Sequence, residues 1–277
     1  MKYFDAHTHV QFVAYDADRD EVLARSKDAE VGMNLVGTQL DTSRAAVELA
    51  ETYDDVYASV ALHPVHTSKS YHDTKELGGP YFAKATQGTE GFMSRGEKFD
   101  FAAYEKLAQS PKVIAIGECG LDYYRLESDT KEVQKEVFIQ HIELANKLGK
   151  PLMLHIRNAY EDALEILKTH AKVKGDVHFF AGNSDIAKQF LDLGFTLSFT
   201  GVVTFTHNYD EVVRNTPIDM ILSETDAPYI TPVPYRGQRN EPIHVREVVK
   251  KLDEIKGMDE EVMAAQIILN SKRVFGI

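Results

Sequence analysis

The chain contains 277 residues, of which 43% are hydrophobic and 27% are charged, and its formal net charge is −12. This composition is typical of a folded globular protein with a large core, and no run of about 18 apolar residues predicts a membrane span. An acidic chain argues against broad binding to duplex DNA through phosphate neutralisation, although bound metal ions can reverse the sign of a pocket locally.

Two further features concern the cellular compartment. Cys119 is the sole cysteine, which excludes an intrachain disulfide. The opening residues, "MKYFDAHTHV", lack the apolar segment and the small-residue cleavage site of a signal peptide. We therefore expect a cytoplasmic protein with no membrane association and no obligate protein partner.

Short β-branched runs alternate with longer amphipathic segments along the chain. The runs predict strands at residues 2–7, 34–39, 56–62, 113–118, 151–156, 176–181, 196–199 and 219–224. The amphipathic segments predict helices at residues 41–53, 130–150, 158–171 and 184–194, followed by two more at about 242–256 and 259–275. Eight strands alternating with helices imply a parallel sheet closed into a (β/α)8 TIM-like barrel, in a single domain spanning residues 1–277. The alternative is an open doubly wound sheet, but no Gly-rich phosphate loop follows the first strand.

Residues 67–99 interrupt this alternation. The segment contains five glycines, shows little periodicity and separates the third predicted strand from its helix. In a barrel it would emerge on the face that carries the active site, because the βα loops form that face. We interpret it as an inserted loop, either a functional lid or a tolerated surface insertion.

The first predicted strand carries three residues able to bind metal. In "YFDAHTHV", residues 3–10, Asp5, His7 and His9 occupy alternate positions and so point to one side of the strand. Two imidazoles on one strand can ligate the same metal ion. The alternative is that the two histidines lie on a polar rim and bind no metal. Asp5 is expected to support the site, since carboxylates commonly orient ligating histidines.

Other metal-capable residues lie at or near the ends of later strands. Glu118 ends the fourth strand, His155 ends the fifth, His178 lies in the sixth and Asp226 follows the eighth. Singly, each has a structural alternative, such as a loop carboxylate, a buried barrel histidine or a helix cap. Because the carboxyl ends of barrel strands share one mouth, we expect all four to converge there.

This convergence predicts a binuclear metal site. Mixed imidazole and carboxylate ligation fits Zn²⁺ or Mn²⁺, and fits Mg²⁺ less well. Glu118 can bridge the two divalent ions. We expect His7, His9 and Asp226 to complete one ion and the two remaining histidines to complete the other. The predicted ligands are His7, His9, Glu118, His155, His178 and Asp226.

Around these residues the chain resembles the TatD-type metal-dependent deoxyribonucleases, a branch of the amidohydrolase-like barrels. The matching motifs are "FDAHTHV", "ALHPVH", "AIGECGLDYY", "PLMLHIRNA", "SETDAPYITP" and "RGQRNEP", which occur in order between residues 4 and 242. The resemblance implies a TIM-like barrel, a binuclear metal centre with the six ligands above, and cleavage of DNA phosphodiesters. Two departures bear on the substrate: "HFFAG" has Phe179 and Ala181 where the family usually has Cys and Ser, and residues 67–99 are longer than usual.

The catalytic roles are assigned to three residues. Asp226 is the expected general base, because a metal-bound carboxylate beside the nucleophilic water can take its proton; a pure ligand role is the alternative. Glu118 acts mainly as a ligand. His63, in "LHPVH" at the end of the third strand, is expected to contact a substrate phosphate or donate a proton, unless it is a structural histidine.

Further substrate contacts are expected from the loops. Arg157 shares the face of His155 and can bind a phosphate bidentately, or form a salt bridge to a barrel carboxylate. The resemblance places the loop "PYRGQRNEP" near the site, so Arg239 and Asn240 are candidate substrate contacts, with a structural role as the alternative. Tyr123, Tyr124 and Tyr229 adjoin the site motifs and can stack on bases or pack ordinarily.

The predicted function is a two-metal nuclease, a 3′–5′ exonuclease-like enzyme with DNA or an oligonucleotide as substrate. A related hydrolase of a small cyclic amide, lactone or phosphoester is the first alternative. Many such enzymes bridge their metals with a modified lysine at the fourth strand, where this chain has Glu118. A non-catalytic metal-binding scaffold is the second alternative, which the complete ligand set disfavours.

Overall fold

The computed structural model describes residues 1–68, 71–73, 91–93, 96–124 and 130–277. In this part of the chain one sheet has eight strands in the order β1-β2-β3-β6-β7-β8-β9-β10, and all pairings are parallel. The strands are β1 Tyr3–Thr8, β2 Val31–Val36, β3 Val56–Val60, β6 Val113–Asp122, β7 Leu152–Arg157, β8 Gly175–Val177, β9 Thr196–Phe199 and β10 Ile221–Ser223.

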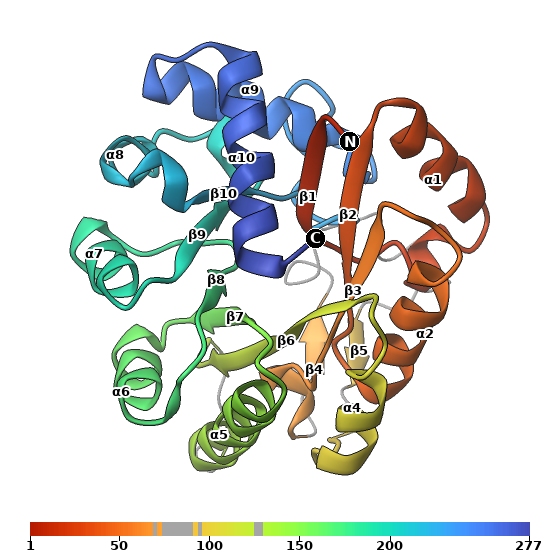
Figure 1. The fold of residues 1–277 in the computed structure, drawn as a ribbon, viewed down its shortest axis with the longest axis vertical. Helices are drawn as coiled ribbons and strands as arrows, with labels where there is room; N and C mark the ends of the chain where they lie inside the picture. Colours follow the sequence, from red (N-terminus) through yellow and green to blue (C-terminus); the bar gives the residue numbers. More distant parts are fainter. Residues whose placement is uncertain (69–70, 74–90, 94–95, 125–129) are drawn as a thin grey trace.

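The sheet closes between its first and last strands. Thr8 and Ala227 form a parallel bridge, the amide of Asp226 donates to the carbonyl of His7 at 2.9 Å, and the amide of His9 donates to the carbonyl of Ala227 at 2.8 Å. Helices surround the strands on the outside (Figure 1). The predicted TIM-like (β/α)8 barrel is confirmed.

The helices connect successive strands or complete the chain. Described are α1 Arg19–Asp28, α2 Leu40–Ala50, α4 Phe101–Leu107, α5 Thr130–Leu148, α6 Tyr160–His170, α7 Ser184–Asp192, α8 Asp210–Asn215, α9 Val245–Lys256 and α10 Glu260–Phe275. Short 3-10 turns occur at Val13–Tyr15, Pro64–His66, Gly201–Thr204, Ile218–Met220 and Pro242–His244. None of these helices is long and apolar enough to cross a membrane, within the residues that the structure describes.

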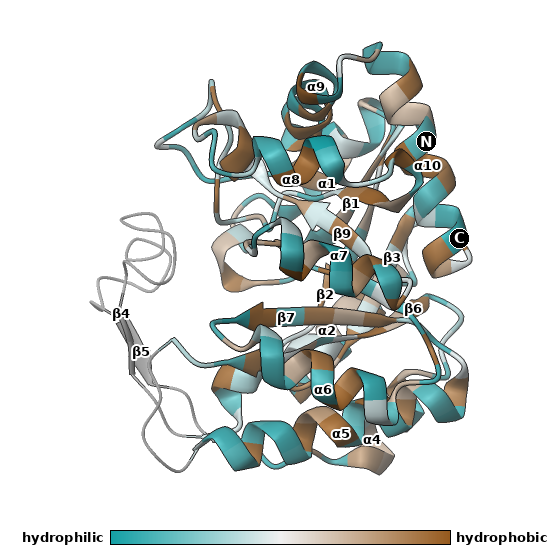
Figure 2. Cartoon of the chain, turned by 90° about the vertical axis from the view of Figure 1, so that its left-hand side faces the viewer, coloured by the Kyte–Doolittle hydropathy of each residue, from teal (hydrophilic) through white to brown (hydrophobic). Residues whose placement is uncertain are grey.

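Hydrophobic burial explains why the strands occupy the centre. All six residues of β1 and all ten of β6 are buried, as expected for strands covered on both faces. Figure 2 shows hydrophobic strands such as β7 inside and hydrophilic surfaces on α5 and α6. Asn34, a buried polar residue of β2, is paired: it donates to the carbonyl of Ala6 at 3.0 Å and to the hydroxyl of Ser59 at 2.9 Å.

Local signals set the ends of several helices. Asn183 caps α7, since its side chain accepts from the amide of Ile186 at 2.9 Å, and Asp259 caps α10 in the same way. Gly257 adopts a left-handed conformation that ends α9. These caps begin or stop helices close to the predicted positions.

The predicted inserted loop at residues 67–99 lies mostly outside the described residues. Within it, β4 Tyr71–Asp73 pairs antiparallel with β5 Gly91–Met93. The expectation that this segment acts as a lid also falls on residues outside the described part of the chain.

Candidate metal centre

The six predicted ligands arrive at one end of the barrel from five different strands. His7 lies near the end of β1 and His9 just beyond it; Glu118 lies within β6 and His155 within β7. His178 directly follows β8, and Asp226 comes three residues after β10. All of these lie at or near carboxyl ends of parallel strands, which meet at one mouth.

One group of donors joins the first and last strands. The Nε2 atoms of His7 and His9 are 3.2 Å apart, and the Oδ1 atom of Asp226 lies 3.9 Å from the first and 3.4 Å from the second. His7 is fully buried and His9 is 3% exposed. The ligand atoms of this group all lie within 4.8 Å of one another, so a single ion can contact all three residues.

Glu118 links this group to the others. Its carboxylate oxygens lie 3.4 Å from His7 Nε2, 3.3 Å from His63 Nε2, 2.8 Å from His155 Nδ1 and 3.6 Å from His178 Nε2. Glu118 therefore belongs to two further groups, one with His7 and His178 and one with His63 and His155. A carboxylate shared in this way can bridge two ions.

This grouping differs from the expected division of ligands. We expected His155 and His178 to share an ion, but the structure stacks His178 on His7, with ring centroids 3.6 Å apart, and leaves 6.2 Å between the rings of His155 and His178. His63, expected to contact substrate, lies among the metal-capable residues, with its ring 4.3 Å from that of His155. His63 directly precedes the 3-10 turn Pro64–His66 and caps it, because its side chain accepts from the amide of Val65.

The charges in the centre suit a cation. Burial opposes ionisation of Glu118, but the neighbouring His63 and the hydrogen bond to His155 outweigh it and hold the pKa of this carboxyl well below its usual value. Burial likewise opposes ionisation of Asp226, and its hydrogen bond to His9 helps to hold its pKa low. Burial lowers the pKa of His7 to about 4, which keeps this imidazole neutral and able to bind metal.

The donor set fits divalent metal ions. The three groups combine imidazole nitrogens with carboxylate oxygens, the mixture found at zinc and manganese sites. The Nδ1 atom of His7 is buried and has no hydrogen-bond partner among the described residues. No hydrogen bond from this atom therefore holds the ring in place of a metal ion. His7, His9, Glu118, His63, His155, His178 and Asp226 are the residues that could hold the ions.

Asp122 supports His155, and the sequence did not reveal it. Its Oδ2 atom lies 3.0 Å from His155 Nε2, and its Oδ1 atom accepts from the amide of Tyr124 at 2.9 Å. Burial opposes protonation of His155, but the hydrogen bonds to Asp122 and Glu118 outweigh it and raise the pKa of this histidine to about 9. Strand β6 was expected to end at Glu118; it continues to Asp122, which is why this carboxylate reaches the site.

A second unexpected carboxylate, Glu224, holds His178. It is fully buried; its Oε1 atom lies 2.8 Å from His178 Nδ1 and accepts from the amide of Phe179 at 2.8 Å. The other carboxylate oxygen of Glu224 accepts from the hydroxyl of Ser198 at 2.7 Å. The same hydroxyl lies 2.5 Å from a carboxylate oxygen of Asp176. In the sequence, the one feature that could have indicated this role is the position of Glu224 two residues before Asp226, in "SETD".

Replacing Glu224 with glutamine should weaken metal binding by about tenfold or more, because partners that orient a ligating histidine typically account for 10–100-fold in affinity. Calorimetric titration of the metal-free protein with Mn²⁺ or Zn²⁺ measures this change. Glu165→Gln, an exposed position on α6, is the matched control. Equal affinities in both variants and the parent chain would show that Glu224 does not orient a ligand.

Asp5 supports the site through the backbone and not through a ligand ring. Its carboxylate accepts from the amide of Thr225 at 2.8 Å and from the Thr225 hydroxyl at 2.5 Å, and the amide of His7 lies 3.3 Å away. These bonds fix the segment that carries Asp226 against the strand that carries His7. Asp5 was expected to support the site, and these backbone contacts are how it does so.

The predicted substrate contacts have different surroundings. Arg157 is the last residue of β7, and its guanidinium carbon lies 3.6 Å from the ring centroid of Tyr124. Arg239 is engaged away from the ligands: it donates to both carboxylate oxygens of Asp18, at 2.8 and 2.6 Å, and its guanidinium carbon lies 4.4 Å from the ring centroid of Tyr15. These contacts hold Arg239 within the protein, and a direct contact with substrate stays a prediction.

Asn240 is likewise held by the protein. It is fully buried, and its amide donates to the carbonyls of Thr225 and Tyr229 at 2.9 and 2.6 Å. Its side-chain oxygen accepts from the amide of Glu241 at 3.0 Å. Asn240 therefore anchors the loop that follows Asp226, and a direct contact with substrate stays a prediction.

A parallel barrel with imidazole and carboxylate donors clustered at the carboxyl ends of its strands defines the class of metal-dependent hydrolases. The family model described as "TatD related DNase" matches residues 4–276. The chain belongs to the TatD family.

Individual relatives agree with this assignment. The metal-dependent hydrolase YabD of Bacillus subtilis is 37% identical over 279 residues, covering 99% of this chain and 99% of that protein. The metal-dependent hydrolase YcfH of Escherichia coli K12 is 34% identical over 281 residues, covering 99% and 95%. Among solved structures, the TatD homologue YJJV of E. coli K12 matches with a TM-score of 0.82 at 24% identity, covering 100% of this chain and 98% of that one.

Proposed function

We propose that this protein is a two-metal deoxyribonuclease, a 3′–5′ exonuclease-like enzyme that hydrolyses DNA phosphodiester bonds. The observation that carries the proposal is the position of Glu118, whose carboxylate belongs to two of the three donor groups at once. Two divalent ions held by these groups would supply an activated water and neutralise the charge on the attacking and leaving oxygens.

The side chains around the ligands have roles consistent with this chemistry. The pKa of Asp226 is held below its usual value, so its carboxylate is ionised and able to accept a proton from a water near His9. His63 is 8% exposed and lies at the edge of the donor groups, where it can contact a metal or a substrate phosphate. Arg157 follows His155 by two residues at the end of β7, and its guanidinium can bind a phosphate oxygen.

The name of the matching family supports DNA as the substrate class, and a carboxylate in place of a modified lysine at the fourth barrel strand supports the nuclease branch. The alternative hydrolase of lactones or cyclic amides uses a similar barrel. Direct comparison of substrates separates these two functions.

The test uses the purified protein supplied with Mn²⁺, Zn²⁺ or Mg²⁺. Single-stranded oligonucleotides blocked at the 3′ or the 5′ end are compared with a panel of lactones and cyclic amides. We expect hydrolysis of DNA that chelator abolishes and that a 3′ block inhibits more than a 5′ block. Hydrolysis of a lactone or amide without cleavage of DNA would contradict the proposal, and so would metal binding with no hydrolysis of any substrate.

A further inference from the structure

Two arginine–aromatic pairs lie in the loops at the mouth of the barrel. In the first, Arg157 at the end of β7 lies over the ring of Tyr124, which is 43% exposed. In the second, the guanidinium carbon of Arg236 lies 4.1 Å from the ring centroid of Phe205, which is 42% exposed. An exposed ring beside an arginine offers a stacking surface for a base and a positive charge for a phosphate.

Both pairs are tied to the metal centre. The amide of Tyr124 donates to Asp122, the carboxylate that also holds His155. Arg236 donates to the carbonyl of Thr231 at 2.8 Å, in the loop that begins with Asp226. The loops after β9 and β10 are joined because the amide of Val233 donates to the hydroxyl of Thr204 at 2.9 Å.

The order of strands places the two pairs on either side of β8. Tyr124 and Arg157 belong to the neighbouring strands β6 and β7, whereas Phe205 and Arg236 follow the neighbouring strands β9 and β10. The segment between them follows β8 and begins with His178. The two pairs therefore flank the segment that carries His178, one of the metal-capable residues.

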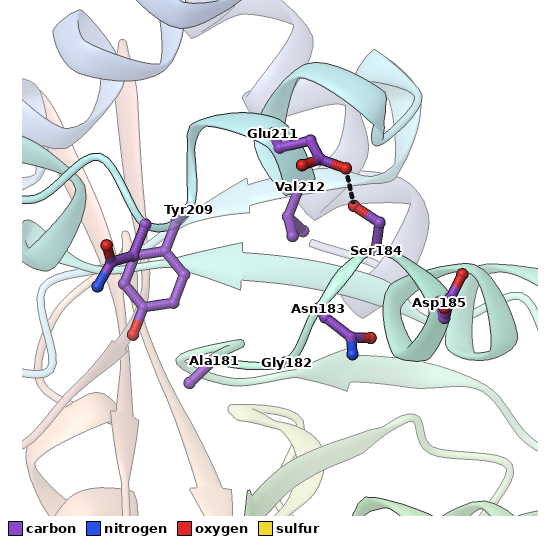
Figure 3. Close-up of a pocket in the computed structure, with 9 residues that line it drawn as sticks. Ala181, Gly182, Asn183, Ser184, Asp185, Tyr209, Glu211 and Val212 are labelled. Carbon is purple, nitrogen blue, oxygen red and sulfur yellow. Dashed lines mark hydrogen bonds between the residues drawn. The ribbon is translucent and has the colours of Figure 1, made fainter.

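A cavity of about 500 Å³ lies in the loops after β8 and β9, between the two pairs in strand order (Figure 3). It is bounded by the start of α7 and the start of α8, which the hydrogen bond from Ser184 to Glu211 joins at 3.0 Å. Its lining includes the ring of Tyr209 and the side chains of Asn183 and Asn208, but no lysine or arginine among the described residues. With Asp185 and Glu211 on its wall, it suits a neutral planar group better than a phosphate.

We propose that the two arginine–aromatic pairs on the side of the mouth from β6 to β10 bind nucleotides of the substrate that lie beyond the scissile bond. The phosphates meet Arg157 and Arg236, and bases stack on the exposed parts of Tyr124 and Phe205. The cavity accepts an intervening base. This inference rests on the proposed nuclease function and adds to it the residues that contact nucleotides beyond the dinucleotide being cleaved. The net charge of −12 fits a short unpaired strand better than a long duplex.

The test compares two substrates in variants of the second pair. One substrate is a ten-nucleotide single-stranded DNA, and the other is bis(p-nitrophenyl) phosphate, a diester with no further nucleotide. In Phe205→Ala and in Arg236→Ala, we expect the ratio of kcat/KM for the oligonucleotide to that for the small diester to fall about five- to tenfold, the lower part of the range for losing one stacking contact. Phe205→Tyr keeps a ring and should keep the ratio.

A matched control comes from the opposite end of the barrel. Arg246 also lies near an aromatic ring, 5.6 Å from the ring centroid of Tyr3, the first residue of β1. Arg246→Ala should leave the ratio unchanged. Thermal unfolding of each variant checks that the fold is retained.

Salt dependence separates a phosphate contact from a packing effect. Binding of a hydrolysis-resistant phosphorothioate decamer is measured by fluorescence anisotropy between low and high KCl. Arg236→Ala should reduce the slope of log affinity against log salt by about 0.7, whereas Phe205→Ala should lower affinity with the slope retained. An unchanged slope in Arg236→Ala would remove the phosphate contact from the proposal.

The inference and the proposed function can fail separately. If the parent chain hydrolyses the small diester but neither binds nor cleaves the decamer, the nuclease function is wrong. If the parent chain cleaves the decamer and the Phe205 and Arg236 variants match Arg246→Ala, the contacts beyond the scissile bond alone are overturned.

Discussion

Replacing Glu118 with glutamine should remove metal and turnover together. The substitution keeps the shape of the side chain but removes the negative charge that faces four imidazole rings. We expect bound metal to fall from about two ions per chain to one or fewer, and turnover to fall by about 10²–10³-fold, the scale of losing one preorganised electrostatic contact. Elemental analysis by mass spectrometry and steady-state kinetics measure the two changes on the same preparation.

The matched control for this variant is Glu136→Gln, an exposed position on α5. It should retain the metal content and the turnover of the parent chain. Full activity in Glu118→Gln, with the parent metal content, would refute the assignment of Glu118 as a bridging ligand.

Asp226→Asn should lower kcat by about 10²–10³-fold while changing KM little, because the amide cannot accept the proton of the attacking water. The backbone at Asp226 is left-handed, with φ of 53°, a conformation that asparagine tolerates better than most residues. The variant therefore tests the carboxylate with little disturbance of the loop. Initial rates over a range of oligonucleotide concentrations separate the two parameters.

The outcome for Asp226 distinguishes two roles. A change confined to KM would exclude the general-base assignment. A loss of kcat that accompanies loss of metal, seen in the same elemental analysis as for Glu118, would make Asp226 a ligand alone.

The fold could be predicted because periodic apolar runs and helix signals survive in the sequence, but the end of β6 could not. Cys119 and Gly120 follow the predicted strand 113–118, which was expected to stop at Glu118. In the structure Gly120 pairs with His155 of β7, and a Cβ atom at this position would lie 2.1 Å from the carbonyl oxygen of His155. Glycine therefore allows the close approach that extends the strand to Asp122.

Alternation along a strand and the positions of strand ends predicted which residues gather at the site. The spacing of His7 and His9 predicts a shared direction, and the structure brings their Nε2 atoms within 3.2 Å. No comparable spacing identifies the carboxylates that hold the ligands, Asp122 and Glu224. Glu224 contacts His178 only because β8, β9 and β10 are neighbours, and the sequence does not state how far each side chain reaches across that sheet.

The seam between β1 and β10 has a consequence for how the protein is made. The carboxylate of Asp5 pairs with Thr225, 220 positions later, and Asp226 bonds to the carbonyl of His7. A ribosome therefore delivers His7 and His9 long before Asp226, the carboxylate that shares their group. Such distant pairing is slow to form. The three donors of this group, and with them a site for any ion that needs all three, therefore come together only when the barrel closes.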